Sequence, residues 1–307
     1  MGRARGAALL TALLIVSVAV AVTAAMLSAQ HLEIRKSATI LNRDRAMQFA
    51  LGGEAWAMGI LTRDATEGNI DHLNEIWAAT PPPMPITGGS ATGRIHDLQG
   101  RFNLNNLLVD GKQSPVDRLR FERLLGVVGL NRGLAVAVID WIDADDVVAG
   151  PGGAEDVSYT SKNPPYRAAN QKMVSPSELR LIEGFSGEGL ERLLPLVTAL
   201  PERTELNINT APVEILMTLV ENMSQTDAAI LEEKRRSDKG LSDLAPLLAN
   251  PVLQGKDVLS AGFGVGSRYF LAEGEVRLGR ARTRLTSLLH RKDGKVSVLR
   301  RVQGGEY

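Results

Sequence analysis

An uncharged stretch near the N-terminus most constrains how this chain of 307 residues can fold. From Ala7 to Leu32 the sequence contains no Asp, Glu, Lys or Arg. A helix over this stretch rises ~1.5 Å per residue and is longer than the ~30 Å hydrocarbon core of a membrane. The apolar part of a cleaved secretory signal is shorter, at roughly 7–15 residues. The stretch therefore predicts a transmembrane helix at residues 7–32.

The residues around this stretch indicate its orientation. Arg3 and Arg5 precede it, and basic residues favour the cytoplasmic side of a membrane. We therefore expect a single-pass inner-membrane protein with a cytoplasmic N-terminus and a periplasmic body. Cleavage as an ordinary secretory signal is the alternative, because the residues at 27–29, Leu-Ser-Ala, resemble a small-residue cleavage site.

Apolar residues continue past the uncharged stretch at helical spacing. They recur three or four residues apart, or at multiples of this spacing, at Ile34, Ala38, Leu41, Phe49, Gly53, Trp56 and Ile60. Many of the residues between them are charged. This pattern predicts one long helix whose second half lies on a globular body through the apolar stripe.

Composition excludes several classes of function. The chain has no Cys, so a disulfide framework and a lipid-modified cysteine anchor are both excluded. Its formal net charge is zero, so no overall field draws it toward nucleic acid or acidic lipid. None of its four histidines stands in a recognisable catalytic motif, and we do not expect an enzyme.

The middle of the chain predicts short helices. In residues 93–108, apolar residues stand between Gly and Asn residues, which is a pattern typical of short strands. Ser114 followed by Pro predicts the start of a helix that ends near residue 125, and residues 134–143 predict a buried helix. Ser175 opens another start signal, with Gly184 as its stop.

The last hundred residues change in character. Residues 204–216 predict a short strand and then a helix capped by Thr210, and further helices begin at Ser224 and Ser242. From residue 268 onward apolar and polar residues alternate, which predicts two or three antiparallel strands. Turn signals stand at Gly274 and at the Asp-Gly pair of residues 293 and 294.

The N-terminal residues resemble the leader of type IV pilins and pseudopilins. In those proteins a prepilin peptidase cuts after the Gly of a short basic leader, the new N-terminus is methylated, and the hydrophobic helix is kept. The resemblance places the cut between Gly6 and Ala7. An ordinary single-pass anchor without a pilin relationship is the alternative for this segment.

One position departs from the usual pilin pattern. Pilins carry Glu at the fifth residue after the cut, where it pairs with the N-terminal amine of a neighbouring, already assembled subunit. This chain has Thr11 there. A charge in hydrocarbon is costly without a partner, and a subunit that no other subunit precedes has no amine to meet. The missing Glu therefore favours a subunit at the tip of a fibre.

Motifs in the middle of the chain make the resemblance specific. Between residues 140 and 212 the chain contains DWIDADD, PGGAED, NPPYRAANQKM, SPSELRLIEGF and LPERTELNINTAP. Together with GRFNLNNL at residues 100–107 and the leader, these segments resemble the large K-type minor pseudopilins of type II secretion systems, the general secretion pathway protein K family. Members of that family also lack the Glu at the position of Thr11.

The resemblance implies a fold and a division into parts. The expected class is α+β: a long N-terminal helix, transmembrane and then amphipathic, packs on a small antiparallel pilin-like sheet with a large inserted helical domain. The expected parts are the leader at 1–6, the transmembrane helix at 7–32, the pilin-like helix, linker and first strands at 33–103, the inserted helical domain with its acidic loop at 104–203, a strand with a helical hairpin module at 204–250, and C-terminal strands at 251–307.

The resemblance also implies a function and partners. It implies a minor pseudopilin at the tip of the type II secretion pseudopilus, which initiates and caps the fibre for export of folded proteins across the outer membrane. The expected partners are the I-type and J-type minor pseudopilins, the prepilin peptidase and other inner-membrane components of the secretion system. No nucleic acid is expected.

An acidic loop is the one candidate ligand site. Six carboxylates fall within about 17 residues with no Lys or Arg between them, at Asp140, Asp143, Asp145, Asp146, Glu155 and Asp156. Such a loop is either solvated or neutralised by a cation, and Ca²⁺ accepts six to eight oxygen ligands in adaptable geometry. The spacing does not fit an EF-hand.

The resemblance supports calcium, because K-type members bind it in this loop. The predicted ligands are Asp143, Asp145, Asp146, Glu155, Asp156 and the amide oxygen of Asn170. Asp140 is placed outside the set, since it falls within a predicted helix. A soluble acidic loop without an ion is the alternative.

A second function is weighed against the first. The strand and helical hairpin beginning at residue 204 resemble the helix-hairpin-helix segments of DNA-binding proteins, so the alternative is a membrane-anchored periplasmic protein with a DNA-binding module. Such hairpins use Gly and basic residues on the phosphates. The connection here, residues 221–224, is Glu-Asn-Met-Ser and has neither.

Overall fold

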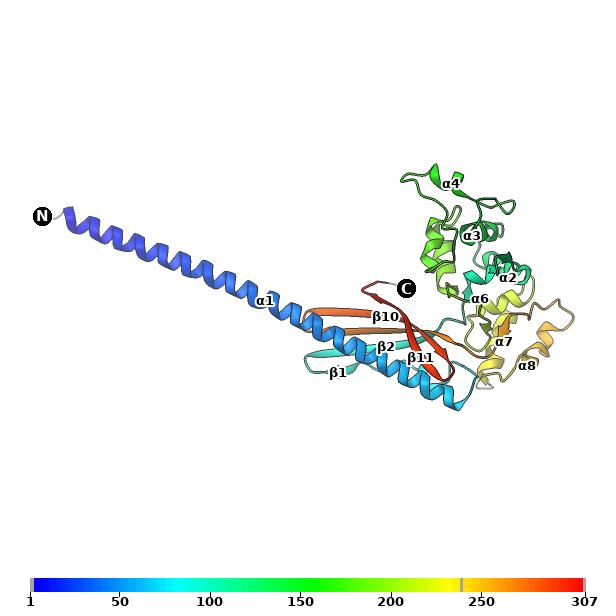
Figure 1. Cartoon of the computed structure of the whole chain (residues 1–307). Helices are drawn as coiled ribbons and strands as arrows, with labels where there is room; N and C mark the ends of the chain where they lie inside the picture. The colour runs from blue at the N-terminus through cyan, green and yellow to red at the C-terminus, as the bar shows by residue number, and fades with distance from the viewer. Residues whose placement is uncertain (1–2, 238–239, 306–307) are drawn as a thin grey trace.

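One helix dominates the molecule. The computed structural model describes residues 3–237 and 240–305. Helix α1 (Arg3–Glu67) is continuous over 65 residues and, at ~1.5 Å per residue, extends for nearly 100 Å. Its N-terminal half projects away from the rest of the protein (Figure 1). Among the described residues, α1 is the one helix that is both long enough and apolar enough to cross a membrane, judged by length and composition. The predicted long helix is confirmed.

The second half of α1 lies against a five-stranded antiparallel sheet. The strand order is β1-β2-β9-β10-β11, with bounds β1 (Met84–Ile86), β2 (Gly89–Asp97), β9 (Tyr269–Leu278), β10 (Ala281–Lys292) and β11 (Lys295–Gln303). Strands β2 and β9 are neighbours in the sheet although the whole helical region separates them in sequence. The α+β fold with an inserted helical region agrees with the prediction.

The face of α1 that packs on the sheet differs from the predicted one. Buried positions recur at Ala46, Ala50, Glu54, Ala57 and Leu61. Each predicted residue from Phe49 onward precedes one of these by one position, so the predicted stripe is rotated by about 100° around the helix. Phe49 and Trp56 are 43% and 53% exposed.

The size of the buried residues explains this difference. Alanine is a weak hydrophobic signal in a sequence, yet its small side chain lets a helix approach a sheet closely. Ala46 and Ala50 pack with Val276, Leu278 and Leu285 of the β9–β10 hairpin. The two large aromatic residues of this part of α1, Phe49 and Trp56, therefore face outward.

The helical region forms a separate lobe beyond the end of the sheet farthest from the N-terminus (Figure 1). Its elements are β3 (Phe102–Asn103), η2 (Leu104–Leu107), β4 (Leu108–Val109), β5 (Lys112–Gln113), α2 (Pro115–Val127), α3 (Leu134–Ile142), α4 (Asp156–Thr160), η3 (Pro176–Leu181), α5 (Gly187–Leu193), η4 (Leu194–Leu196), β6 (Val197–Thr198), β7 (Leu206–Asn207), α6 (Val213–Leu216), η5 (Met217–Leu219), α7 (Gln225–Ser237), α8 (Ala245–Leu248), η6 (Pro251–Leu253) and β8 (Phe263–Gly264). One hydrophobic core runs through this region.

Several local predictions can be checked against these elements. The Ser114 side chain caps α2, and Ser175 forms a capping box with Glu178, as their sequence signals predict. Three details are wrong. Helix α8 begins at Ala245, three residues after the predicted start at Ser242. Gly274 lies inside β9 rather than at a turn, since it pairs with Leu285. Helix α6 begins after Pro212 and not at Thr210.

Candidate metal centre and a second acidic cluster

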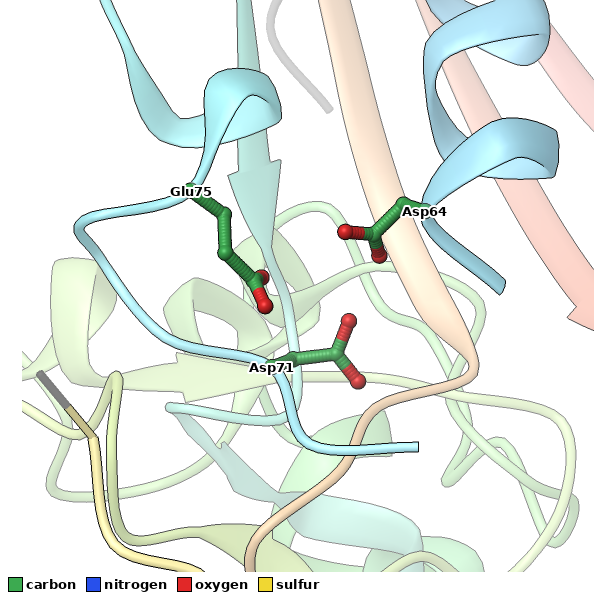
Figure 2. Close-up of side chains that lie close together, drawn as sticks. All are labelled: Asp64, Asp71 and Glu75. Carbon is green, nitrogen blue, oxygen red and sulfur yellow. The ribbon is translucent and has the colours of Figure 1, made fainter. Parts of the chain in front are cut away.

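Two groups of three carboxylates come together in the structure. We call Asp140, Asp143 and Glu155 the loop cluster, and Asp64, Asp71 and Glu75 the junction cluster. In each group, one oxygen atom from every residue lies within 4.8 Å of the corresponding oxygen atoms of the other two. The loop cluster lies at the end of α3. The junction cluster lies where α1 ends and the chain crosses toward the helical region (Figure 2).

Local structure positions the loop cluster. Asp140 lies in the last turn of α3, Asp143 caps the C-terminus of that helix, and Glu155 is the N-cap residue of α4. The loop between them returns closely over Asp140, whose Oδ1 accepts a hydrogen bond from the Ala149 N–H at 3.0 Å. Gly153 is needed for this return, because a Cβ there would lie 2.2 Å from Asp140 Oδ2.

The loop cluster contains buried oxygen atoms without partners. Asp140 Oδ2, Asp143 Oδ1 and both carboxylate oxygens of Glu155 are buried and accept no hydrogen bond from the described part of the chain. Asn170 Oδ1 is also buried without a partner in the described part of the chain. The Asn170 N–H donates to the Trp141 carbonyl at the end of α3. Buried polar atoms are normally satisfied, so this group of oxygens has the donor set that a hard cation requires.

The electrostatics of the loop cluster agree with this interpretation. Burial raises the pKa of Glu155 to about 7, and repulsion from Asp140 and Asp143 adds to the shift. Burial also raises the pKa of Asp143 to about 6, with repulsion from Asp145 as the next cause. The pKa of Asp140 is raised by burial as well. A bound cation reverses such shifts, because it favours the ionised carboxylates.

The other predicted ligands make different contacts. Asp145 Oδ1 accepts from the Val147 N–H at 2.9 Å, and Asp146 Oδ1 accepts from the Asn170 side chain at 2.9 Å. Asp156 Oδ1 accepts from the Ala168 N–H at 2.9 Å. Of the predicted ligands, the structure thus brings Asp143 and Glu155 together. It adds Asp140, which lies outside the predicted ligand set.

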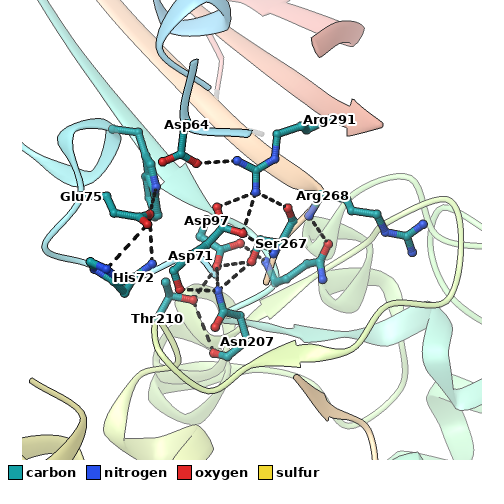
Figure 3. A network of polar contacts seen from close by, with 12 residues as sticks. Asp64, Asp71, His72, Glu75, Asp97, Asn207, Thr210, Ser267, Arg268 and Arg291 are labelled. Carbon is teal, nitrogen blue, oxygen red and sulfur yellow. Dashed lines mark hydrogen bonds and ion pairs between the residues drawn. The ribbon is translucent and has the colours of Figure 1, made fainter. Parts of the chain in front are cut away.

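The junction cluster is paired with an arginine of the same chain. Arg291 of β10 donates from Nη1 to Asp64 at 2.5 Å and from Nη2 to both oxygens of Asp71 at 2.5 and 2.6 Å (Figure 3). Its guanidinium lies over the Phe270 ring, 4.8 Å from the centroid. Glu75 accepts from the indole N–H of Trp77 and from the His72 N–H. Each carboxylate of this cluster therefore has a partner within the chain.

A buried network extends from the junction cluster into the helical region (Figure 3). Asp97, at the end of β2, accepts from Asn207 Nδ2 at 3.1 Å, from Ser267 Oγ at 2.6 Å and from Thr210 Oγ1. Asn207 Nδ2 also donates to the Asp71 carbonyl. Burial raises the pKa of Asp97 and brings the pKa of Asp71 to about 7. The network joins α1, the sheet and the helical region through polar contacts.

Sequence reasoning missed the junction cluster. Residues 64–75 contain four acids, at Asp64, Glu67, Asp71 and Glu75, with no Lys or Arg between them, and Arg291 comes more than two hundred residues later. The local sequence shows the density of acids but not the arginine that pairs with two of them. The pairing of β10 with β9 brings the arginine to the acids.

The leader positions are described only in part. Gly6 and Ala7 belong to the α1 backbone, and their side chains lie outside the part that the structure describes. Thr11 lies on the exposed N-terminal half of α1.

Comparison with known proteins identifies the family. Residues 100–202 and 206–266 match two family models, both described as type II secretion system (T2SS), protein K. The chain is 39% identical to the type II secretion system protein K of Pseudomonas aeruginosa over 312 residues, which covers 97% of this chain and 92% of that protein. The chain belongs to the type II secretion system protein K family. This family is structural and non-enzymatic, in agreement with the sequence-based expectation.

Further relatives support the protein K assignment over the full length. The type II secretion system protein K of Aeromonas hydrophila is 34% identical, covering 99% of this chain and 98% of that protein. A solved structure described as the GspK-GspI-GspJ complex from the enterotoxigenic Escherichia coli type 2 secretion system contains a chain that matches with a TM-score of 0.78 at 27% identity. The match covers 88% of this chain and all of that one. The α+β fold is therefore that of protein K.

Proposed function

We propose that this protein is a minor pseudopilin at the tip of the type II secretion pseudopilus, where it initiates and caps the fibre for export of folded proteins across the outer membrane. The observation that carries this proposal is the outward apolar face of α1, which continues from the uncharged stretch onto the globular part. Thr11, in place of the Glu that would pair with a preceding subunit, supports the tip position.

The outward face of α1 forms one wall of an apolar groove. Phe49, Gly53 and Trp56 line it from the helix, Ile76 lines it from the segment before β1, and Met84 lines it from β1. Residues of β2 and β9 complete the lining, and the cavity volume is 220 Å³. Ile76 is 71% exposed. Large apolar residues exposed together mark interaction sites.

The occupant that fits this groove is the amphipathic N-terminal helix of an I-type or J-type minor pseudopilin. The related chain of known structure occurs in a complex with GspI and GspJ. A helix presents apolar anchors at spacings of three and four residues, and Phe49, Gly53 and Trp56 show the same spacing on α1. Packing two such helices together buries both apolar faces.

Charged substitutions on the outward face test this assembly. Phe49→Glu with Trp56→Glu should abolish co-purification of the I-type and J-type subunits with the full chain, since burying an unpaired carboxylate is costly. Thr62→Glu is the matched control, because Thr62 is exposed and lies on the other side of α1. Equal recovery of the partners with the double variant would contradict the proposed interface.

Processing by the prepilin peptidase is proposed between Gly6 and Ala7, followed by methylation of Ala7. Only Gly lacks a Cβ that would obstruct approach of the peptidase to the backbone. Gly6→Leu should leave the uncut form in the membrane on an immunoblot, whereas Gly2→Leu should be processed normally. Normal maturation of Gly6→Leu would overturn the pseudopilin proposal.

The proposed topology follows from α1. The helix crosses the inner membrane once, with its N-terminus in the cytoplasm and the sheet and helical region in the periplasm until the subunit joins the fibre. Basic Arg3 and Arg5 on the short side and the uncharged residues 7–32 support this orientation. N-terminal sequencing of the mature protein distinguishes a methylated Ala7 from a secretory start at Gln30.

Calcium is the proposed ligand of the loop cluster. The unpartnered oxygens of Asp140, Asp143 and Glu155 fit a hard cation, with Asn170 Oδ1 as a neutral donor. The chain has no Cys and none of these donors is a His, so the set does not favour a soft metal. A bound ion would hold the end of α3 against the start of α4.

The DNA-binding alternative has little support. Arg235 of α7 is 3% exposed and donates to the Ile208 carbonyl, so it is not available to phosphates. Glu221, in the connection before α7, pairs with Arg123 and Arg132. Arg235 is thus bound inside the helical region, and Arg123 and Arg132 are paired with a carboxylate.

A further inference from the structure

Basic residues gather at the end of the sheet that faces the N-terminal half of α1. We call this the basic end; its cations are Arg35, Lys36, Arg43 and Arg45 on α1 and Arg277, Arg280, Arg282 and Arg284 on the β9–β10 hairpin. The acids within the same two segments, 33–45 and 275–284, are Glu33, Asp44 and Glu275. The chain as a whole has zero formal charge, so the basic end is a local excess of five positive charges.

Packing fixes the hairpin beside α1. Val276 and Leu278 of β9 are buried against the α1 alanines. At the turn, the Gly279 N–H donates to the Gly88 carbonyl at 3.2 Å, and a Cβ on Gly279 would lie 3.4 Å from Nδ2 of Asn42. Figure 1 shows the β9–β10 and β1–β2 turns at this end of the sheet. The arginines of the hairpin are thus held at a defined height along α1.

That height is close to a membrane surface. The uncharged stretch ends at Leu32, ten residues before Asn42, and this interval corresponds to ~15 Å of helix. The headgroup layer occupies about 5–7 Å of it. The hairpin turn then stands roughly 8–10 Å above the headgroups, which is about one Debye length at physiological ionic strength. The usual tilt of about 20° brings one side of the molecule closer still.

The arginines surround a single carboxylate. Glu275 accepts from Arg277 at 2.7 Å, from Arg282 at 2.6 Å and from Arg284 at 3.3 Å. These contacts, Arg282 first, lower the pKa of Glu275 to about 2. One carboxylate cannot neutralise three guanidiniums, and each arginine presents five N–H donors in a planar fork. Unused donors and two positive charges therefore face the solvent, with exposed Arg280 at the turn.

We propose that the basic end binds the phosphates of anionic phospholipid headgroups in the leaflet from which α1 emerges. The proposal rests on the proposed membrane insertion of α1. Guanidinium groups bind phosphate in a bidentate manner, and juxtamembrane basic clusters are attracted to anionic lipid surfaces. The hairpin gives the subunit a second contact with the membrane beside the helix. This contact limits the tilt and rotation of the sheet before assembly and is lost when the subunit is lifted into a fibre.

The test measures the height of the hairpin above the lipid. The chain has no Cys, so Thr87→Cys gives a single site for a fluorophore on the exposed β1–β2 turn. The labelled full chain is inserted into vesicles of phosphatidylcholine alone or with phosphatidylglycerol, each with an acceptor on the headgroups. Energy transfer should be severalfold greater in the vesicles with phosphatidylglycerol and should fall at high salt.

Arginine substitutions supply the matched pair of variants. Replacing the four hairpin arginines by Gln, together with Glu275→Gln so that no carboxylate is left unpaired, should remove the difference between the two vesicles. The control replaces four exposed arginines of the helical region by Gln, at Arg132, Arg167, Arg180 and Arg192. It should keep the difference in full.

The outcomes separate this proposal from the one on which it rests. Flotation with the vesicles reports insertion of α1. A chain that floats but gives equal transfer in both vesicles would overturn the basic-end proposal alone, as would equal losses in the two sets of arginine variants. A chain that does not float would contradict membrane insertion and this proposal with it.

Discussion

The loop cluster and the junction cluster contain the same number of carboxylates at similar separations, yet the described chain supplies a cation to only one of them. In the junction cluster, Arg291 contacts Asp64 and Asp71 and each acid has a partner. In the loop cluster, four carboxylate oxygens of Asp140, Asp143 and Glu155 are buried without a partner among the described residues. Three acids in proximity are therefore not enough to indicate a metal. The informative feature is whether the fold also brings a cation to them.

The two clusters also differ in how far apart in the sequence the residues that they join lie. The junction cluster and its network tie together the end of α1, the ends of β2 and β10, and Asn207 of the helical region. The loop cluster ties Asp140 and Asp143 to Glu155 within one loop. The first arrangement joins distant parts of the fold through contacts within the chain, whereas the second is proposed to make the order of one loop depend on calcium.

The largest effect is expected from removing the internal cation. Arg291→Met leaves the buried carboxylates of Asp64 and Asp71 unpaired and should lower the free energy of unfolding by about 3–5 kcal/mol. Urea denaturation of the detergent-solubilised full chain, followed by tryptophan fluorescence, measures this loss; Trp77 reports on the region because its ring lies 5.4 Å from Phe270.

Arg282→Met on the same strand is the control for this loss. Arg282 is 56% exposed and pairs with Glu275 at the surface, where an ion pair contributes no more than about 1 kcal/mol. Similar losses for the two variants would mean that the junction cluster does not depend on its arginine.

Calcium should order the loop that closes the loop cluster. At about thirty times the dissociation constant, a ligand that binds only the folded state adds about 2 kcal/mol of stability. Added Ca²⁺ should therefore protect residues 144–170 from limited proteolysis, and Asp143→Ala with Glu155→Ala should remove the protection. Mg²⁺ should protect little, because it is smaller and stricter about octahedral geometry.

The matched control for proteolysis removes two exposed acids elsewhere, Glu188→Ala with Asp243→Ala. That variant should keep calcium protection in full. Loss of protection in both double variants would show an effect of net charge rather than of a site.

The junction cluster should make stability depend on pH. Burial raises the pKa of Asp71 from its ordinary value of 3.8 to about 7, although Arg291 opposes the shift. The folded chain then binds this proton more tightly than the unfolded chain, so the stability from protonation is complete below pH 4 and is lost as pH rises through 7. We expect a fall of about 2–3 kcal/mol between pH 5 and pH 8 from this group.

Asp71→Asn tests the assignment of that pH dependence. It should flatten the decline in unfolding free energy between pH 5 and pH 8, whereas Asp293→Asn, in the exposed β10–β11 turn, should not. An unchanged slope in Asp71→Asn would assign the pH dependence to other groups.

The smallest effect is expected at the edge of the loop cluster. Asp145 is exposed and bonded to the Val147 N–H, and its charge acts on Asp143 from outside the group. Asp145→Asn should weaken calcium binding by about threefold, or roughly 0.6 kcal/mol, as expected for a distant charge in a solvated position. A complete loss of binding would place Asp145 among the ligands.

The two clusters also differ in how far sequence could predict them. The density of acids between residues 140 and 156 indicates the loop cluster. The sequence places Asp140 too far inside its predicted helix to be a ligand, yet Asp140 lies in the last turn of α3, and the loop folds back over it through Gly153. The junction segment has a similar density of acids, but the sequence does not show that β-sheet pairing brings Arg291 to them.

The packing of α1 shows the same limit for the fold. Its length and continuity follow from the uncharged stretch and the helical period. Its buried face does not, because small Ala46 and Ala50 face the sheet while larger Phe49 and Trp56 face outward. A periodicity based on hydrophobicity weights the larger residues, and here a partner outside the chain is proposed to cover them.

The most direct test of the central claim is a calorimetric titration of Ca²⁺ into the full chain and two double variants. The claim is that the loop cluster binds a cation from solution, whereas the carboxylates of the junction cluster pair with Arg291 of the same chain. We predict saturable binding with a dissociation constant of about 0.1–1 mM, lost in Asp143→Asn with Glu155→Gln and kept in Asp64→Asn with Asp71→Asn. Absence of binding at millimolar Ca²⁺, or its loss only in the Asp64 and Asp71 variant, would contradict the account.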